Sequence, residues 1–246
     1  MMKAALSAWM VLALAANGYA AEKITRESMT SQGAERTYYL FVPDSAKDKP
    51  APLIVLLHGS GRDGKILVEH WQSVAKKEGI ILAGPDAIVR SGWGMRDDGP
   101  LLLRHVIEAV QGNYAVDRRR MYVFGHSAGA IHGISMGVLE SEYLAAVAVH
   151  AGAVSPSVVP YIAKAPRKIP IAVWVGTNDP SFPVRQVRES LELLNRQDFN
   201  VELTEINGHT HNYYGRSSEI NKAAWAFLQG KRLEKDPQYQ DYAVPR

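Results

Sequence analysis

The sequence of 246 residues contains no cysteine. A chain without thiols can form no disulfide, and it excludes cysteine nucleophiles and every other form of thiol chemistry. The absence is compatible with export from the cell but does not by itself indicate it. Any chemistry in this protein must therefore rest on hydroxyl, imidazole and carboxylate side chains.

A strong excess of charge of one sign is also missing. Lys and Arg total 28 and Asp and Glu total 25, a formal net charge of +3. The tightest basic cluster is Arg118-Arg119-Arg120, and no basic stripe interleaves with aromatic residues. This pattern disfavours nucleic acid and acidic polymers as partners.

Long apolar runs are absent beyond the N-terminus, so no later stretch predicts a membrane-spanning helix. Ala4 to Ala16 form the one long apolar segment, and Lys3 precedes it. Gly18 and Ala20 are small residues three positions before and directly before a cleavage point after Ala20. The pattern predicts a secretory signal peptide over residues 1–20, and with it a secreted or periplasmic protein without a stable membrane anchor.

The remaining chain alternates strand-like and helix-like segments. With 46% hydrophobic residues it can bury one large core, so we expect a single domain over residues 21–246. Its polar, proline-containing end, residues 231–246, is expected to be loosely ordered. Repeated β-then-α order predicts a mostly parallel sheet with helices on both faces. The predicted strands cover residues 35–43, 53–57, 80–83, 120–124, 145–149, 171–175 and 201–206, and the predicted helices cover residues 66–78, 101–110, 128–139, 184–196 and 217–228.

Three chemically active residue types follow successive predicted strands. Ser127 lies in the stretch GHSAGA after residues 120–124, and Asp179 lies in GTNDP after residues 171–175. His209 and His211 lie in NGHTHN after residues 201–206. In parallel sheets, functional residues gather where strands end at their carboxyl edge. Serine, aspartate and histidine in this chain order have the placement of the triad of α/β-hydrolases, and we expect that fold.

The chemistry explains why these residue types are needed. A serine hydroxyl becomes a good nucleophile when an imidazole takes its proton, and a carboxylate fixes the imidazole's tautomer. Gly125 and Gly129 permit the sharp turn that would lift Ser127 clear of the sheet. A serine at a helix N-terminus also has backbone N–H groups beside it. We expect an oxyanion hole from the N–H groups of Ala128 and Ser60.

Several fragments resemble a known family: RTYYLFVP, PLIVLLHGSG, DDGPLLLRHVIEAV, VDRRRMYVFGHSAGA and VWVGTNDPSFPV. They are similar to esterases related to polyhydroxybutyrate depolymerases and to feruloyl or acetylxylan esterases. The resemblance covers residues 35–230. It implies a secreted, cofactor-independent serine esterase with a triad of Ser127, Asp179 and a histidine of residues 209–211. The chain departs from many members by Ser60, where they carry a cysteine, and by the residues that follow His209.

Two histidines compete for the role of general base. Alignment on Gly-His-Thr favours His209, as in the polyester and feruloyl esterases. The stretch from His211 to Tyr214 resembles a segment of the related S-formylglutathione hydrolases, in which the histidine is catalytic. The longer loop after residue 206 also gives His211 more reach toward Ser127. We expect His211 to be the base and keep His209 as the alternative.

Other polar residues receive plainer interpretations. Asp86, after another strand, is the main rival to Asp179 as the triad acid, but it precedes the serine in the chain. Asp97 and Asp98 are expected to cap a helix, and His126 to face away from the nucleophile. Trp93, on a Gly-flanked loop, and His150, at a strand end, are candidates for the substrate pocket. His209 and His211 lack further ligand residues, so no metal is expected.

The sequence therefore predicts a serine esterase that forms an acyl-enzyme on Ser127 and uses no cofactor. Its partner would be a small-molecule or oligomeric ester, and the protein would be a monomer or small homo-oligomer. Two alternatives are a non-catalytic ligand-binding protein on the same fold and a serine peptidase.

Overall fold

The computed structural model describes residues 22–240. The predicted signal peptide and residues 241–246 lie outside the described residues. Within the described part of the chain, no helix combines the length and the apolar character needed to cross a membrane.

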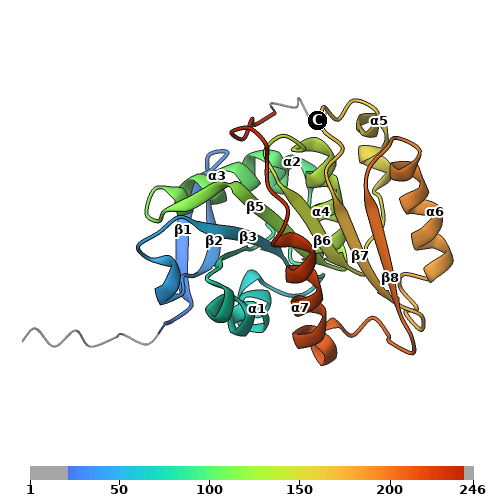
Figure 1. Ribbon diagram of the computed structural model, residues 1–246, viewed down its shortest axis with the longest axis horizontal. Coiled ribbons are helices and arrows are strands. Elements are labelled where there is room, and N and C mark those ends of the chain that lie inside the picture. Colours follow the sequence, from blue (N-terminus) through green and yellow to red (C-terminus); the bar gives the residue numbers. More distant parts are fainter. Residues whose placement is uncertain (1–21, 241–246) are drawn as a thin grey trace, which may run out of the picture.

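One eight-stranded sheet forms the centre of the molecule (Figure 1). The strand order is β1-β2-β4-β3-β5-β6-β7-β8. β1 pairs with β2, and β2 with β4, in antiparallel orientation, and every other pair is parallel. The strands are β1 (Thr25–Ser31), β2 (Ala34–Phe41), β3 (Ala51–Leu57), β4 (Ile81–Pro85), β5 (Val116–His126), β6 (Ala146–His150), β7 (Ile171–Gly176) and β8 (Val201–Ile206).

Helices cover both faces of this sheet. One face carries α3 (Pro100–Gln111), α4 (Ala128–Leu139), α5 (Val159–Ile162) and α6 (Val184–Asn195), and the other carries α1 (Gly64–Glu78) and α7 (Ser217–Leu228). Each face encloses its own apolar core, because residues alternate between the two faces along each strand. The predicted α/β architecture is confirmed.

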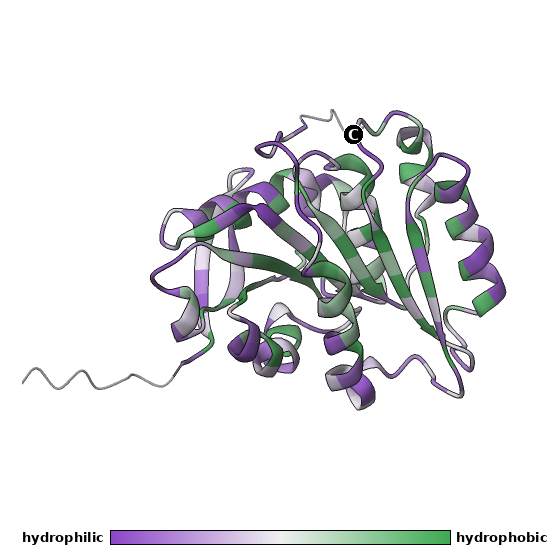
Figure 2. Ribbon diagram, viewed as in Figure 1, coloured by the Kyte–Doolittle hydropathy of each residue, from purple (hydrophilic) through white to green (hydrophobic). Residues whose placement is uncertain are grey.

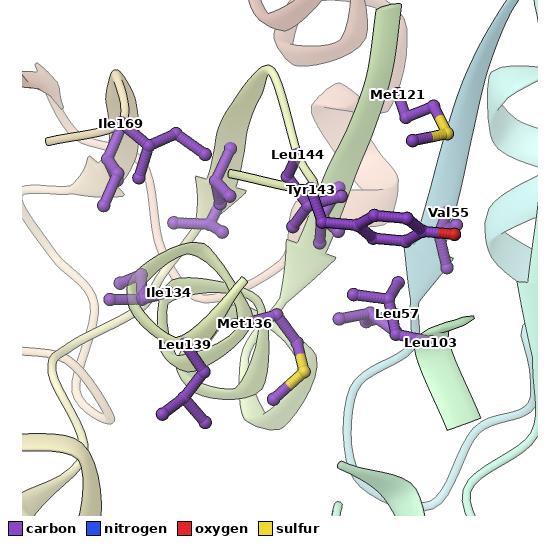
Figure 3. Packing of buried hydrophobic residues seen from close by; sticks show 14 of the residues in the cluster. Val55, Leu57, Leu103, Met121, Ile134, Met136, Leu139, Tyr143, Leu144 and Ile169 are labelled. Carbon is purple, nitrogen blue, oxygen red and sulfur yellow. The ribbon is translucent and has the colours of Figure 1, made fainter. Parts of the chain in front are cut away.

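The central strands are apolar along their whole length because both of their faces are buried. All residues of β3, β4, β6 and β7 are buried, and Figure 2 shows the hydrophobic colour concentrated on these strands. Figure 3 shows one of the cores, where side chains of α4 approach those of β3 and α3. These interdigitating aliphatic side chains fix α4, and hence the residue before it, relative to the sheet.

Three short elements were not predicted: strand β1 and the one-turn helices α2 (Met95–Asp98) and α5. The sequence of β1, TRESMTS, is polar, and the strand is mostly exposed at the edge of the sheet. Its regular pairing with β2 supplies the backbone hydrogen bonds that hold it. The helix α2 is one turn long, too short to show an apolar period.

The expectation of a loosely ordered tail is wrong for residues 231–240. Leu233 is buried, and its N–H donates to the carbonyl oxygen of Arg119 at 2.9 Å. The Tyr239 ring packs edge-on against Tyr143, with the Arg104 guanidinium 4.6 Å from its centroid. Leu233 and Tyr239 thus pack this otherwise polar segment against the body of the protein, and the N–H of Gln238 adds a hydrogen bond to the carbonyl oxygen of Glu142.

Candidate active site

The stretch that contains Ser127 is a strand–turn–helix, as predicted. β5 ends at His126 and α4 begins at Ala128. Ser127 between them has φ +57° and ψ −118°, a conformation that L-residues rarely adopt. Hydrogen bonds hold it there: its N–H donates to the carbonyl oxygen of His150 at 3.0 Å, and its own carbonyl oxygen accepts from Ala130 and Ile131. The surrounding structure thus maintains a strained serine at the end of the sheet.

The two glycines that flank the turn are required by close backbone contacts. A Cβ on Gly125 would lie 2.2 Å from the carbonyl oxygen of Gly129. A Cβ on Gly129 would lie 2.0 Å from the carbonyl oxygen of Leu57, on the neighbouring strand. Both clashes are with backbone, which cannot move aside as a flexible side chain can. The glycines therefore let α4 start directly against β3.

We expect Gly129→Ala to destabilise the fold by about 3 kcal/mol, since overpacking against fixed backbone is costly. Urea denaturation of the purified variant measures this change in unfolding free energy. Ala128→Gly is the matched control at the adjacent helix position, where the cost is about 1 kcal/mol or less. An unchanged midpoint for Gly129→Ala would show that the backbone around the turn relaxes more freely than these distances indicate.

Ser127, His211 and Asp179 come together at hydrogen-bond distances. Nε2 of His211 lies 2.9 Å from Oγ of Ser127. Nδ1 of the same ring lies 2.8 Å from Oδ2 of Asp179. Since the carboxylate can only accept, Nδ1 carries the proton and Nε2 is free to accept the serine hydroxyl proton. Three residues from the ends of β5, β7 and β8 thus form one hydrogen-bonded chain.

Asp179 and His211 are each held on more than one side. The Asp179 side chain is fully buried, and its Oδ1 accepts hydrogen bonds from the backbone N–H groups of Ser181 and Phe182 at 2.9 Å. The Phe182 ring stacks on the His211 ring, with 5.6 Å between centroids and 7° between planes. The carboxylate and the imidazole are therefore oriented before any ligand arrives.

His209, the alternative base, points elsewhere. Its Nε2 lies 3.1 Å from Nε2 of His150, and Nδ1 of His150 lies 3.1 Å from Nδ1 of His126. Each contact needs one protonated and one unprotonated nitrogen. Because burial lowers the pKa of all three histidines, the rings form a chain of neutral imidazoles. His209 is thus a support of the loop that carries His211, and the structure does not bring it to Ser127.

Two expectations about the other histidines need correction. His150 was expected in the substrate pocket, but it is fully buried and both of its ring nitrogens contact histidines. His126 was expected to face away from the nucleophile, yet its ring lines the cavity beside Ser127 and lies 5.0 Å from the His211 ring. The pleat of β5 and the turn after it direct this ring under the triad, which a motif alone does not reveal.

Burial keeps several of these histidines neutral. Removal from water, together with the smaller effect of neighbouring histidines, lowers the pKa of His126 to about 3 and that of His150 to about 2. Burial likewise lowers the pKa of His132 to about 4. In the unfolded chain these residues titrate near the ordinary value of 6.5.

We therefore expect stability to fall as the pH falls below 6.5. Above that pH these histidines are neutral in both the folded and the unfolded protein. Below it only the unfolded chain binds protons, until the pH reaches the pKa that the histidine has in the folded protein. Each such histidine lowers the unfolding free energy by about 1.4 kcal/mol per pH unit. Urea denaturation at pH 7, 6 and 5 measures the slope, and His132→Gln should reduce it by about one histidine's share. A slope that His132→Gln does not change would contradict the assignment.

Asp86, the rival acid, contacts the start of α1, whereas His211 bonds to Asp179. The Asp86 carboxylate accepts a hydrogen bond from the N–H of Gly64, at the start of α1, at 2.8 Å. Asp98, expected as a helix cap, is instead buried and pairs with Arg36 at 2.5 Å, and it also accepts from the N–H groups of Ile88 and Gly94. Asp98 therefore holds the loop after β4, including Gly94 at the start of α2, and it does not cap α3, whose N-cap residue is Gly99.

Trp93, on that same loop, is tied to the strand end beside Ser127. Its indole N–H donates to the carbonyl oxygen of His58 at 2.8 Å, and its ring stacks on His132. Trp93 lines a cavity of about 250 Å³ together with Ala128 and Ile131. The structure thus places Trp93 where a bound group beside Ala128 would meet it.

A second and larger cavity, of about 390 Å³, opens over Ser127 and His211. Ser60, one of the two expected oxyanion donors, lines it, and Ala128, the other, begins α4, whose first N–H groups have no intrahelical acceptor. Besides His126 and Gly59, three lining residues were not assigned to this cavity from the sequence: Arg62, Asn212 and Tyr214. The sequence could have indicated them, because Arg62 directly follows the motif HGSG and the other two belong to the motif HNYY.

No group of three or more histidines and carboxylates is arranged to hold a metal ion among residues 22–240. The site in this part of the chain consists of a serine, an imidazole, a carboxylate and two cavities. This combination on a mostly parallel sheet defines the class of the protein, an α/β-hydrolase.

A family model described as phospholipase/carboxylesterase matches residues 101–224, half of the chain. The chain belongs to this family. The match confirms the predicted class, carboxylic ester hydrolases, while the polyhydroxybutyrate depolymerase-like subgroup stays a prediction.

Individual proteins are similar to the chain as well. The bifunctional acetylxylan esterase/xylanase XynS20E of Neocallimastix patriciarum is 26% identical over 181 residues, which are 69% of this chain and 25% of that protein. The chain spans about a quarter of the length of the curated relatives it matches. A ferulic acid esterase has a TM-score of 0.69 at 18% identity, covering 85% of this chain and 98% of that one. An S-formylglutathione hydrolase from Agrobacterium tumefaciens has a TM-score of 0.67 at 15% identity, covering 85% and 94%. These two structures establish likeness of fold alone.

Proposed function

We propose that this protein is a serine esterase that hydrolyses carboxylic esters through an acyl-enzyme on Ser127. The observation that carries the proposal is the hydrogen-bonded chain from Ser127 through His211 to Asp179. Family membership supports it. We also propose export to the periplasm or the medium, on the signal pattern of residues 1–20.

The reaction divides into two halves. In the first, Nε2 of His211 takes the proton of Ser127 while Oγ attacks the ester carbonyl, and the N–H groups of Ala128 and Ser60 stabilise the oxyanion. The carbonyl re-forms, the alcohol leaves, and His211 gives the proton to its oxygen. In the second half, water attacks the acyl group in the same way and the proton returns to Ser127. Asp179 holds the imidazole and stabilises its charged form throughout.

The acyl group of the substrate is proposed to be short or aromatic. The cavity of about 250 Å³ beside Ala128 has Trp93 and Ile131 in its wall, which suit an acetyl or a flat aromatic acyl group. Relatives named as an acetylxylan esterase and a ferulic acid esterase support these two acyl types.

The test is labelling with a fluorophosphonate, combined with hydrolysis of p-nitrophenyl acetate. The wild-type protein should gain the label on the peptide that contains Ser127 and should hydrolyse the ester, and Ser127→Ala should do neither. Absence of both label and hydrolysis in the folded wild-type protein would favour the ligand-binding alternative. Cleavage of acylated amino-acid p-nitroanilides at a higher kcat/KM than the ester would favour a peptidase.

A further inference from the structure

The larger cavity carries a permanent positive charge that the proposed triad does not use. Arg62 lines this cavity together with Ser127 and His211. Within residues 22–240, no carboxylate lies at ion-pair distance from its guanidinium, which instead lies 5.3 Å over the centroid of the Tyr214 ring. An exposed arginine held on an aromatic face keeps its N–H donors available for a planar anion.

Two carboxylates on neighbouring segments, those of Asp63 and Asp179, have partners other than Arg62. Asp63 caps α1 by accepting from the N–H of Ile66 at 3.2 Å, and its other oxygen faces Arg90 at 3.9 Å. Asp179 is fully buried behind His211, with both oxygens hydrogen-bonded. His126, which also lines the cavity, is held neutral by burial, which lowers its pKa to about 3. Among the described residues that line the cavity, Arg62 is thus the one permanent charge, and none of them is a carboxylate.

The direction of proton transfer determines which part of a bound ester lies beside Arg62. Nε2 of His211 must deliver a proton to the oxygen of the departing alcohol, so the alcohol has to lie beside His211. His211 and Arg62 line the same cavity, whereas Ala128 and Trp93 line the smaller one. The alcohol therefore belongs in the cavity of about 390 Å³, and the acyl group in that of about 250 Å³.

We propose that Arg62 makes this esterase selective for esters whose alcohol part carries a carboxylate. The carboxylate lies against the Arg62 guanidinium, and the Tyr214 ring holds the arginine in position. Asn212 in the same cavity wall supplies an amide for a further hydrogen bond to the alcohol. This inference rests on the proposed function, because it assigns the leaving-group side of the same site.

The experiment compares two acetate esters that differ in one charge, 4-acetoxybenzoate and 4-acetoxybenzamide. The wild-type protein is expected to have the higher kcat/KM for the anionic ester. In Arg62→Gln the anionic-to-neutral ratio should fall roughly threefold to tenfold, mainly through KM, because the charge lies away from the reacting atoms. Arg90→Gln is the matched control: it removes an exposed arginine from the neighbouring loop outside the cavity, and the ratio should persist.

Further arms separate this inference from the proposed function. Monophenyl succinate, with its carboxylate on the acyl side, should gain no such preference over phenyl acetate from Arg62. The inference is overturned if the wild-type ratio for the benzoate and benzamide esters is one or lower, or if Arg62→Gln leaves that ratio unchanged. Hydrolysis of 4-acetoxybenzamide in those cases would leave the serine esterase proposal standing. Failure to hydrolyse either ester would overturn both.

Discussion

His211→Ala is expected to lower kcat for p-nitrophenyl acetate by about 10⁶-fold, because removal of the base alone costs about as much as removal of a whole triad. The imidazole nitrogen 2.9 Å from Oγ of Ser127 is the group that would take the serine proton. Steady-state hydrolysis measures the loss, and circular dichroism verifies that the variant is folded.

His209→Ala is the matched control, since it removes the same side chain two residues earlier. His209 contacts His150 rather than Ser127, so the variant should lose stability while keeping measurable turnover. The opposite pair of results, with activity lost in His209→Ala and kept in His211→Ala, would mean that His209 is the base.

Asp179→Asn is expected to lower kcat by about 10⁴-fold with little change in the fold, by analogy with the same substitution in a serine protease. The amide oxygen can still accept from the N–H groups of Ser181 and Phe182, which now bond to Oδ1. The amide NH₂ then faces Nδ1 of His211, which must accept. The proton moves to Nε2, and the imidazole can no longer take one from Ser127.

Asp86→Asn is the control for the rival acid. Its carboxylate accepts from the N–H of Gly64, and an amide oxygen can do the same, so kcat should change little. Nearly normal turnover in Asp179→Asn, together with a large loss in Asp86→Asn, would move the acid role to Asp86.

Local sequence was sufficient for most of the fold because its elements carry strong hydrophobic patterns. The predicted bounds of α4, β8 and α7 agree with the structure to the residue. α4 starts after a glycine-flanked turn and α7 has an apolar stripe, so the local sequence alone predicts each helix. β1 is polar on most of its length, and only pairing with β2 makes it a strand.

The candidate site divides in the same way. The sequence by itself determined that Ser127 follows a strand, that Asp179 and the two histidines follow later ones, and that their order is Ser, Asp, His, because parallel strands bring their carboxyl ends to one edge. Only the tertiary structure shows that His211, and not His209, lies at hydrogen-bond distance from Ser127. Both histidines lie on one loop, but the His209 ring is buried against His150, which is 59 residues away in the chain. The tertiary structure also places Arg62 in one cavity with His211, since the two residues lie on loops far apart in the sequence, and no local pattern predicts that such loops meet.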